Sequence, residues 1–156
     1  MYFASVLMLT LVLPLGSAYA EHELVRESLP WMLLVGKWWA FWAGGARLFI
    51  AGVRQQVQPR FTSQTIFGIG SDDPLPFIRE LGMANCAMGV LGMTAAFVPA
   101  FVLPAAIVSG LYYLQAGVGH VRHGGRNLRR NVAMVSDLTV AVALLGYAGW
   151  AAASYL

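Results

Sequence analysis

Residues 101–119, FVLPAAIVSGLYYLQAGVG, contain no charged side chain, and this stretch decides the fold class. A hydrocarbon core about 30 Å thick is crossed by about 20 helical residues, which is close to the length of the stretch. Further apolar stretches with few charges lie at residues 2–20, 30–53, 77–97 and 132–155. The sequence therefore predicts an all-α fold, a polytopic transmembrane helical bundle with four to five spans.

The composition agrees with a membrane environment. Apolar residues make up 58% and charged residues 11% of the chain, whereas a soluble domain carries about 25% charged residues. We predict one transmembrane domain over residues 1–156, with helices at about 2–20, 30–53, 77–97, 101–121 and 132–155 and a cytoplasmic loop at 54–76. The basic residues, which give a net charge of +3, cluster in two loops beside apolar spans. We therefore expect the lipid bilayer as partner and exclude nucleic acid.

The first apolar stretch allows two interpretations. It is followed by Ala18-Tyr19-Ala20, a small-x-small pattern typical of a signal peptidase site. No Lys or Arg precedes the stretch, however, and a signal peptide normally begins with positive charge. A retained helix is favoured, and either outcome puts Glu21 on the non-cytoplasmic side.

The charges of the connecting segments predict the topology. The connections after the second and fourth stretches are basic, and if the spans alternate these two connections share a side, which should be the cytoplasm. We expect the amino terminus inside, if the first span is retained, and the carboxyl terminus outside. Residues 61–70, with Phe61 and Phe67 among polar neighbours, are interpreted as a short interfacial or re-entrant segment on the cytoplasmic surface. The basic residues of the two connections are Arg54, Arg60, Arg122, Arg126, Arg129 and Arg130.

Several polar residues interrupt the apolar stretches, and each needs a reason, because a charge inside a bilayer costs several kcal/mol. Under the predicted topology they share the cytoplasmic third of the membrane, where groups on adjacent helices can pair. One interpretation is a structural network that fixes helix register. The other is a proton-accessible or ligand-binding pocket that opens to the cytoplasm. The candidate residues are Arg47, Arg79, Glu80, Asn85, His120 and Asp137.

Other features have simpler explanations. Lys37 lies beside three tryptophans and is expected to extend toward the outer interface as an anchor. His120 and His123 have the spacing of one helical face, but two histidines in a basic segment are a weak metal signal, and we predict no metal site. Cys86 is expected to be a packing residue.

Small residues repeat along the third and fourth stretches. One face of the third helix carries Gly82, Cys86, Gly89, Gly92 or Met93, and Ala96. A comparable face of the fourth carries Ala106, Gly110 and Gly117. Small residues allow helix backbones to approach closely in a membrane. We therefore expect these two helices to pack against each other as a tight antiparallel hairpin.

The third stretch also carries a distinctive motif, Pro76-Phe77-Ile78-Arg79-Glu80-Leu81-Gly82-Met83-Ala84-Asn85, continued by Gly89-Val90-Leu91-Gly92. Together with Ile66-Phe67-Gly68, Asp73-Pro74 and Ala116-Gly117-Val118-Gly119-His120-Val121, it resembles an uncharacterised bacterial integral-membrane family, the family of unknown function numbered 6790, over residues 60–140. The resemblance implies a small multi-pass protein of the bacterial inner membrane. It nominates Glu80, Asn85 and His120 as motif positions, and Asp137 less securely. The general shape is also similar to DoxX-type membrane proteins, by architecture alone.

Three functions are compatible with these features. The first is a non-enzymatic accessory or interaction subunit, packed as a homo-oligomer or in a larger membrane complex. The second is a transporter or a permeation protein for protons or a small solute that uses the polar residues. The third is a quinone-associated redox subunit, with His120 bonded to the head group. No catalytic residues and no nucleotide-binding or hydrolase motif are recognised, so we expect no enzymatic activity, and the cofactor is left open.

Overall fold

A computed structural model describes residues 2–25, 29–122 and 128–154 of the chain. These residues form helices joined by short connections, and no strand occurs among them, so the all-α prediction is confirmed. The elements are α1 (Tyr2–Leu7), η1 (Met8–Val12), α2 (Leu13–Leu24), α3 (Trp31–Trp39), η2 (Ala40–Arg47), α4 (Leu48–Val57), η3 (Phe61–Ile66), α5 (Leu75–Thr94), η4 (Pro99–Phe101), α6 (Val102–Arg122) and α7 (Leu128–Ser154). The segments η1, η2 and η3 are π-helical and η4 is a 3₁₀ turn.

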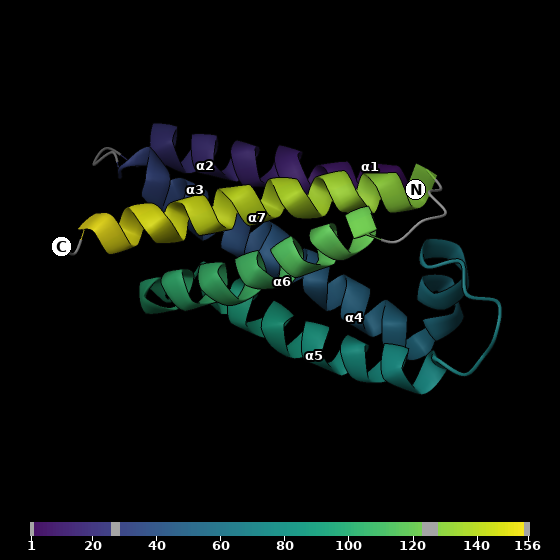
Figure 1. The fold of residues 1–156 in the computed structure, drawn as a ribbon. Coiled ribbons are helices and arrows are strands. Elements are labelled where there is room, and N and C mark those ends of the chain that lie inside the picture. The colour runs from purple at the N-terminus through teal and green to yellow at the C-terminus, as the bar shows by residue number, and fades with distance from the viewer. Residues whose placement is uncertain (1, 26–28, 123–127, 155–156) are drawn as a thin grey trace.

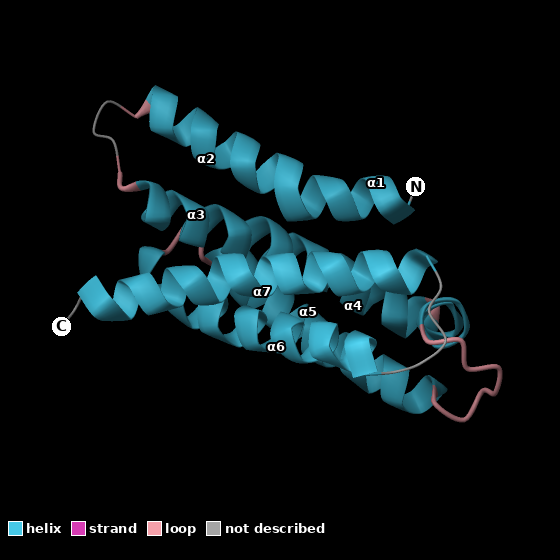
Figure 2. Cartoon of the chain, turned by 45° about the horizontal axis from the view of Figure 1, so that its top comes forward, coloured by secondary structure: helices cyan, strands magenta, loops and turns pink. Residues whose placement is uncertain are grey.

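The long helices run back and forth along one axis (Figure 1). The chain passes without interruption from α1 through η1 into α2, and again from α3 through η2 into α4. In the turned view of Figure 2 the α1–α2 helix lies along one side of the bundle formed by the other long helices. The buried apolar core lies where η2, α6 and α7 meet, and includes Ala43, Ala106, Val140 and Leu144.

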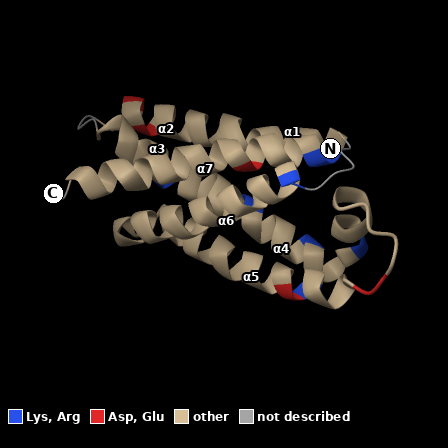
Figure 3. Ribbon diagram, in the orientation of Figure 1, with Lys and Arg blue, Asp and Glu red and all other residues tan. Residues whose placement is uncertain are grey.

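Basic residues gather at one end of the bundle, the end where α1 begins and α4 ends (Figure 3). The start of α5, the end of α6 and the start of α7 lie at the same end (Figure 1). We call it the basic end. The described arginines on these segments are Arg54, Arg60, Arg79, Arg122, Arg129 and Arg130.

Three helices in the described part of the chain are long and apolar enough to cross a membrane: Tyr2–Leu24, Pro99–Arg122 and Leu128–Ser154. The helix from Trp31 to Val57 and helix α5 have comparable lengths but are not among these three. The three apolar helices thus point to a membrane protein.

The loops are shorter than the sequence predicted. We expected a loop at 54–76, but α4 continues to Val57 and η3 adds another helical segment. The helix ends where Pro59 follows Gln58, because the residue before a proline is disfavoured in helical conformation. The first helix was predicted to end at about residue 20, but α2 continues to Leu24 and includes Glu21. Nothing before Leu24 breaks that helix, so a polar end was mistaken for a loop.

The glycine stripe of α5 faces a different helix from the one expected. A Cβ on Gly92 would lie 2.5 Å from the Gly45 backbone nitrogen, and one on Gly89 would lie 2.7 Å from the Phe49 nitrogen. The stripe therefore packs on η2 and α4, and the predicted hairpin contact with the fourth helix is wrong. On α6, Gly110 and Gly117 are covered by leucine side chains of α7. The small residues of α5 therefore pack on η2 and α4, and those of α6 pack on α7.

Candidate functional site

An open cavity of about 750 Å³ lies toward the basic end, lined by residues of α1, η1, η2, α4, η3, α6 and α7. Helix α5 contributes two residues, Leu81 and Asn85, to its lining. Much of the wall is apolar, whereas its polar members include arginines, a carboxylate, a histidine and amides. The polar members are Tyr2, Ser5, Arg47, Arg54, Gln55, Thr62, Asn85, Tyr112, Tyr113, Gln115, His120, Arg130 and Asp137.

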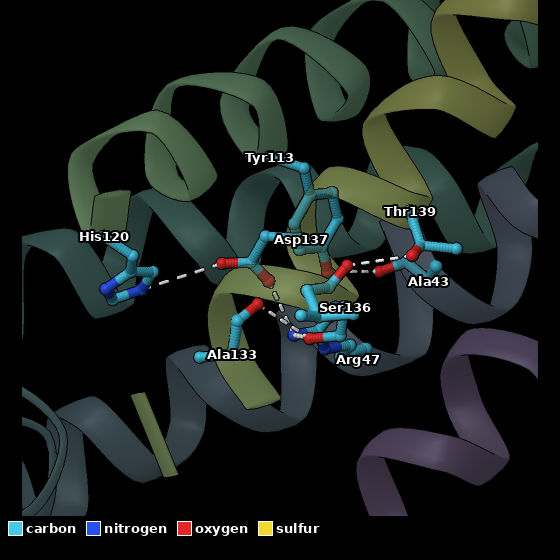
Figure 4. A network of polar contacts seen from close by, with 9 residues as sticks. Ala43, Arg47, Tyr113, His120, Ala133, Ser136, Asp137 and Thr139 are labelled. Carbon is cyan, nitrogen blue, oxygen red and sulfur yellow. Dashed lines mark hydrogen bonds and ion pairs between the residues drawn. The ribbon is translucent and has the colours of Figure 1, made fainter. Parts of the chain in front are cut away.

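An ion pair between Arg47 and Asp137 joins η2 to α7 (Figure 4), and both residues line the cavity. Arg47 Nη2 donates to Asp137 Oδ1 at 2.7 Å and to Ser136 Oγ at 2.9 Å. The two charged side chains are only 14% and 8% exposed. Ser136 donates in turn to the Ala133 carbonyl oxygen at 2.9 Å. Charge-assisted hydrogen bonds of this length are the strong ones, so the pair ties η2 firmly to α7.

Residues of α6 complete this polar network. His120 Nε2 lies 3.8 Å from Asp137 Oδ2, on the side of the carboxylate away from Arg47 (Figure 4). The Tyr113 hydroxyl donates to the Ala43 carbonyl oxygen at 2.7 Å, and the Arg47 guanidinium lies 4.9 Å from the centre of the Tyr113 ring. One carboxylate thus contacts an arginine and a histidine that come from two different helices.

Arg47 Nη1 and Asn85 Oδ1 are among the buried polar atoms that have no hydrogen-bond partner in the described part of the chain, and both residues line the cavity. Asn85 is 1% exposed and uses its Nδ2 to donate to Gln55 Oε1 at 2.8 Å. Tyr112 also interacts with the Asn85 amide. Asn85 Oδ1 nevertheless accepts no hydrogen bond of normal geometry from the described residues. Unsatisfied buried donors and acceptors are costly, so one unused donor and one unused acceptor in a cavity lining mark a place for a polar molecule.

The lining includes two pairs of residues that the sequence interpretation did not connect. Arg54 follows Arg47 by seven residues, and Asp137 follows Arg130 by seven residues. Seven residues return a helix to nearly the same face about 10 Å further along. Arg54 and Arg130 thus lie nearer the basic end than the buried ion pair, and we call their level the mouth. Arg54 was interpreted as a loop residue, and the seven-residue spacing was the signal that could have identified it.

Arg79 and Glu80 were predicted to join the polar group, but both are exposed and neither lines the cavity. The buried face of α5 carries Ile78, Gly82, Asn85, Gly89 and Gly92. At roughly 100° per residue, Arg79 and Glu80 point more than about 100° away from Asn85. The structure brings Arg47, Asn85, His120 and Asp137 to one cavity and leaves these two outside it.

A second polar contact lies toward the opposite end of the bundle. Lys37 Nζ is 2.8 Å from Glu21 Oε1, and Trp38 Nε1 donates to Glu21 Oε2 at 2.7 Å. Trp42 Nε1 also donates to Ser17 Oγ at 2.9 Å. Lys37 therefore binds a carboxylate of α2 instead of serving only as an anchor, because α2 extends far enough to present Glu21 to it.

Metal ligands are scarce in this region. Among residues 2–25, 29–122 and 128–154, no group of three or more His, Cys, Asp or Glu side chains could hold a metal ion. His123 lies outside the described residues, as do Arg26, Glu27 and Arg126.

An all-helical bundle with three candidate membrane-spanning helices and a partly polar cavity at its basic end defines the class of this protein. The chain belongs to the family of unknown function (DUF6790), whose model matches residues 1–153. The resemblance inferred from residues 60–140 is confirmed, and the match extends over the first helix as well. No curated protein and no solved structure matches the chain.

Proposed function

We propose that this protein is a multi-pass protein of the bacterial inner membrane that binds a small molecule in the cavity at its basic end. The observation that carries the proposal is the cavity of about 750 Å³ in which Arg47 and Asn85 each keep a buried polar atom without a partner in the described chain. A network that only fixed helix register would satisfy its members with one another. This function corresponds to the transporter or permeation alternative, for which binding is the first step.

The proposed topology has five spans, with the amino terminus and the basic end in the cytoplasm and the carboxyl terminus outside. Two facts support it: the long helices alternate in direction (Figure 1), and the described arginines outside the apolar segments lie at one end (Figure 3). The positive-inside rule assigns that end to the cytoplasm. Reporter fusions after Val57 and after Ser154 test the topology. A periplasmic signal from the Val57 fusion contradicts it.

The binding test uses a matched pair of alanine substitutions. Ala51 lines the cavity, whereas Ala84 is exposed on α5 and lies outside the lining. We expect A51F to fill the cavity and to abolish the binding of small molecules that co-purify with the wild-type protein, whereas A84F keeps them. Mass spectrometry of extracts from the three proteins, each in nanodiscs, measures this. Equal retention by A51F and A84F contradicts the proposal.

Flux in proteoliposomes separates permeation from binding alone. Asp137→Asn alters the buried ion pair, and Glu80→Gln is the matched control because Glu80 is exposed and outside the lining. A permeation protein loses flux in the first variant and keeps it in the second. Binding without flux in the wild-type protein leaves a binding or accessory role, and the predicted interaction subunit is then tested by co-purification after mild solubilisation.

A quinone is a second candidate ligand, supported by one specific contact. The His120 ring lies 6.1 Å from the Phe67 ring at 30° between planes, and both residues line the cavity. An imidazole beside an aromatic ring suits a planar head group with carbonyl oxygens. Organic extraction of the purified protein, followed by absorption spectroscopy of the extract, tests this candidate, and an extract without quinone rules it out.

A further inference from the structure

The charges that line the cavity are not balanced. Among the described lining residues, Arg47, Arg54 and Arg130 supply three positive charges and Asp137 supplies one negative charge. Without counting His120, the lining carries a formal excess of two positive charges. A cavity with such an excess attracts anions and raises their local concentration.

We propose that the cavity binds an amphiphile with an anionic oxygen head group, a carboxylate or a phosphate. This inference rests on the proposed binding function and names its ligand class. Guanidinium groups present paired N–H donors that match the oxygen atoms of carboxylates and phosphates. A neutral ligand leaves the charge excess uncompensated.

The arginines lie at two levels. Arg54 and Arg130 lie at the mouth, and Arg47 lies deeper, at the level of the buried ion pair, which we call the floor. Arg54, the exposed residue of the set, lies at the mouth, with its Cζ 3.4 Å from the centre of the Phe61 ring. Stacking occupies the face of a guanidinium and leaves its in-plane N–H groups available. Seven residues deeper, Arg47 keeps Nη1 unused beside its bonds to Asp137 and Ser136. An anionic head group is thus attracted at the mouth and bound at the floor.

The remaining wall suits a hydrocarbon chain. Val6 and Leu9 face the cavity from the first helix, and Leu48, Ile50 and Leu81 face it from α4 and α5. The first helix lies along one side of the bundle (Figure 2), so a chain packed against it is next to the surface that contacts lipid. Asn85 Oδ1 remains available to a hydroxyl group of the ligand.

The inference is tested by displacement of a fluorescent probe, dansyl-undecanoate, from the full-length protein in phosphatidylcholine nanodiscs. The competitors are dodecanoate, dodecanol, phosphatidylglycerol, inorganic phosphate and a quinone. We expect dodecanoate or phosphatidylglycerol to compete at least about tenfold more strongly than dodecanol, because a charge-assisted hydrogen bond is lost with the alcohol. Which of the two competes better tells whether the head group is that of a fatty acid or of a phospholipid.

Two exposed arginines provide the matched variants. Arg54→Gln removes a charge from the cavity mouth, whereas Arg79→Gln removes one from the same end of the bundle outside the lining. Both residues are exposed, so neither change should prevent folding. We expect R54Q to lower the affinity for dodecanoate roughly tenfold and to leave the affinity for dodecanol unchanged. R79Q should leave both affinities unchanged. Added salt should lower the affinity of the wild-type protein for dodecanoate.

The outcomes separate this inference from the proposed function. If dodecanol or the quinone competes as well as dodecanoate, the inference of an anionic head group is overturned. The proposed binding function then still stands. Inorganic phosphate competing as well as the amphiphiles overturns the requirement for a chain. If the probe does not bind, the inference of an anionic amphiphile as ligand is overturned. The proposed binding function is contradicted separately, if A51F retains every co-purifying molecule.

Discussion

Replacing Asp137 with asparagine keeps the shape of the side chain but removes the counter-ion of Arg47, whose side chain is 14% exposed. Breaking a buried ion pair from one side costs about 3–5 kcal/mol, because a buried charge is left uncompensated. Arg47 retains its bond to Ser136 and its position 4.9 Å from the Tyr113 ring, and a cation–π contact contributes about 1–2 kcal/mol. We therefore expect a loss near the lower limit, about 3 kcal/mol of unfolding free energy.

The measurement is unfolding of the purified protein in mixed micelles with increasing dodecyl sulfate, followed by tryptophan fluorescence. A double-mutant cycle with Arg47→Gln isolates the interaction. If the pair is coupled as the 2.7 Å contact indicates, the double variant is at least about 1.5 kcal/mol more stable than the sum of the single changes predicts. Strict additivity, or a loss below about 0.5 kcal/mol for D137N, refutes the reasoning.

Three further predictions concern other parts of the chain. Gly92→Ala should lower the free energy of unfolding by about 1–3 kcal/mol, because a Cβ there would lie 2.5 Å from a backbone nitrogen of η2. Gly146→Ala is the control, because a Cβ there meets open space and the substitution should be neutral or slightly stabilising. Thermal unfolding of the two variants compares their stabilities. Glu21→Gln removes the carboxylate that binds the lysine of α3 at 2.8 Å, so hydrogen exchange in α2 should speed up while that in α7 does not change. The hydrogen bond from Arg60 holds the pKa of Asp72 below its usual range, so this pair stabilises the segment before α5 at neutral pH and the contribution is lost as the pH falls through the lowered pKa. An NMR titration should show the Asp72 pKa return upward in Arg60→Gln, and an unchanged pKa contradicts that cause.

The meeting of Arg47, His120 and Asp137 could be predicted from the sequence, whereas the position of Arg79 and Glu80 was predicted wrongly. Arg47, His120 and Asp137 interrupt apolar helices at similar depths, and the structure brings these three together. Arg79 and Glu80 were expected at that depth, but they lie nearer the basic end, since Gly82 already packs against Gly52 and Gln55. They also face away from the cavity, because direction depends on which face of the helix is buried. The buried face of α5 contains Asn85 and several glycines, and the helical period alone would have excluded the two exposed residues.

Helix pairing was the harder problem. The glycine stripe correctly indicates a close contact for α5, but small residues do not identify the partner helix. The expected partner was the next helix in the chain, whereas the actual partner is the preceding one, where Gly45 and Gly52 provide matching space. The cavity itself follows from this pairing, since α5 packs on α4 and contributes only two residues to the lining. Such a choice depends on how whole surfaces fit together.

The first helix supplies one side of the cavity through Tyr2, Ser5, Val6 and Leu9, and Ala18-Tyr19-Ala20 belongs to the same continuous helix. Proteolytic processing after residue 20 would therefore do more than shorten the chain. It would remove one wall and open the cavity beside Arg47 and Asp137. The mass of the mature polypeptide therefore bears directly on whether the proposed binding cavity exists in the cell.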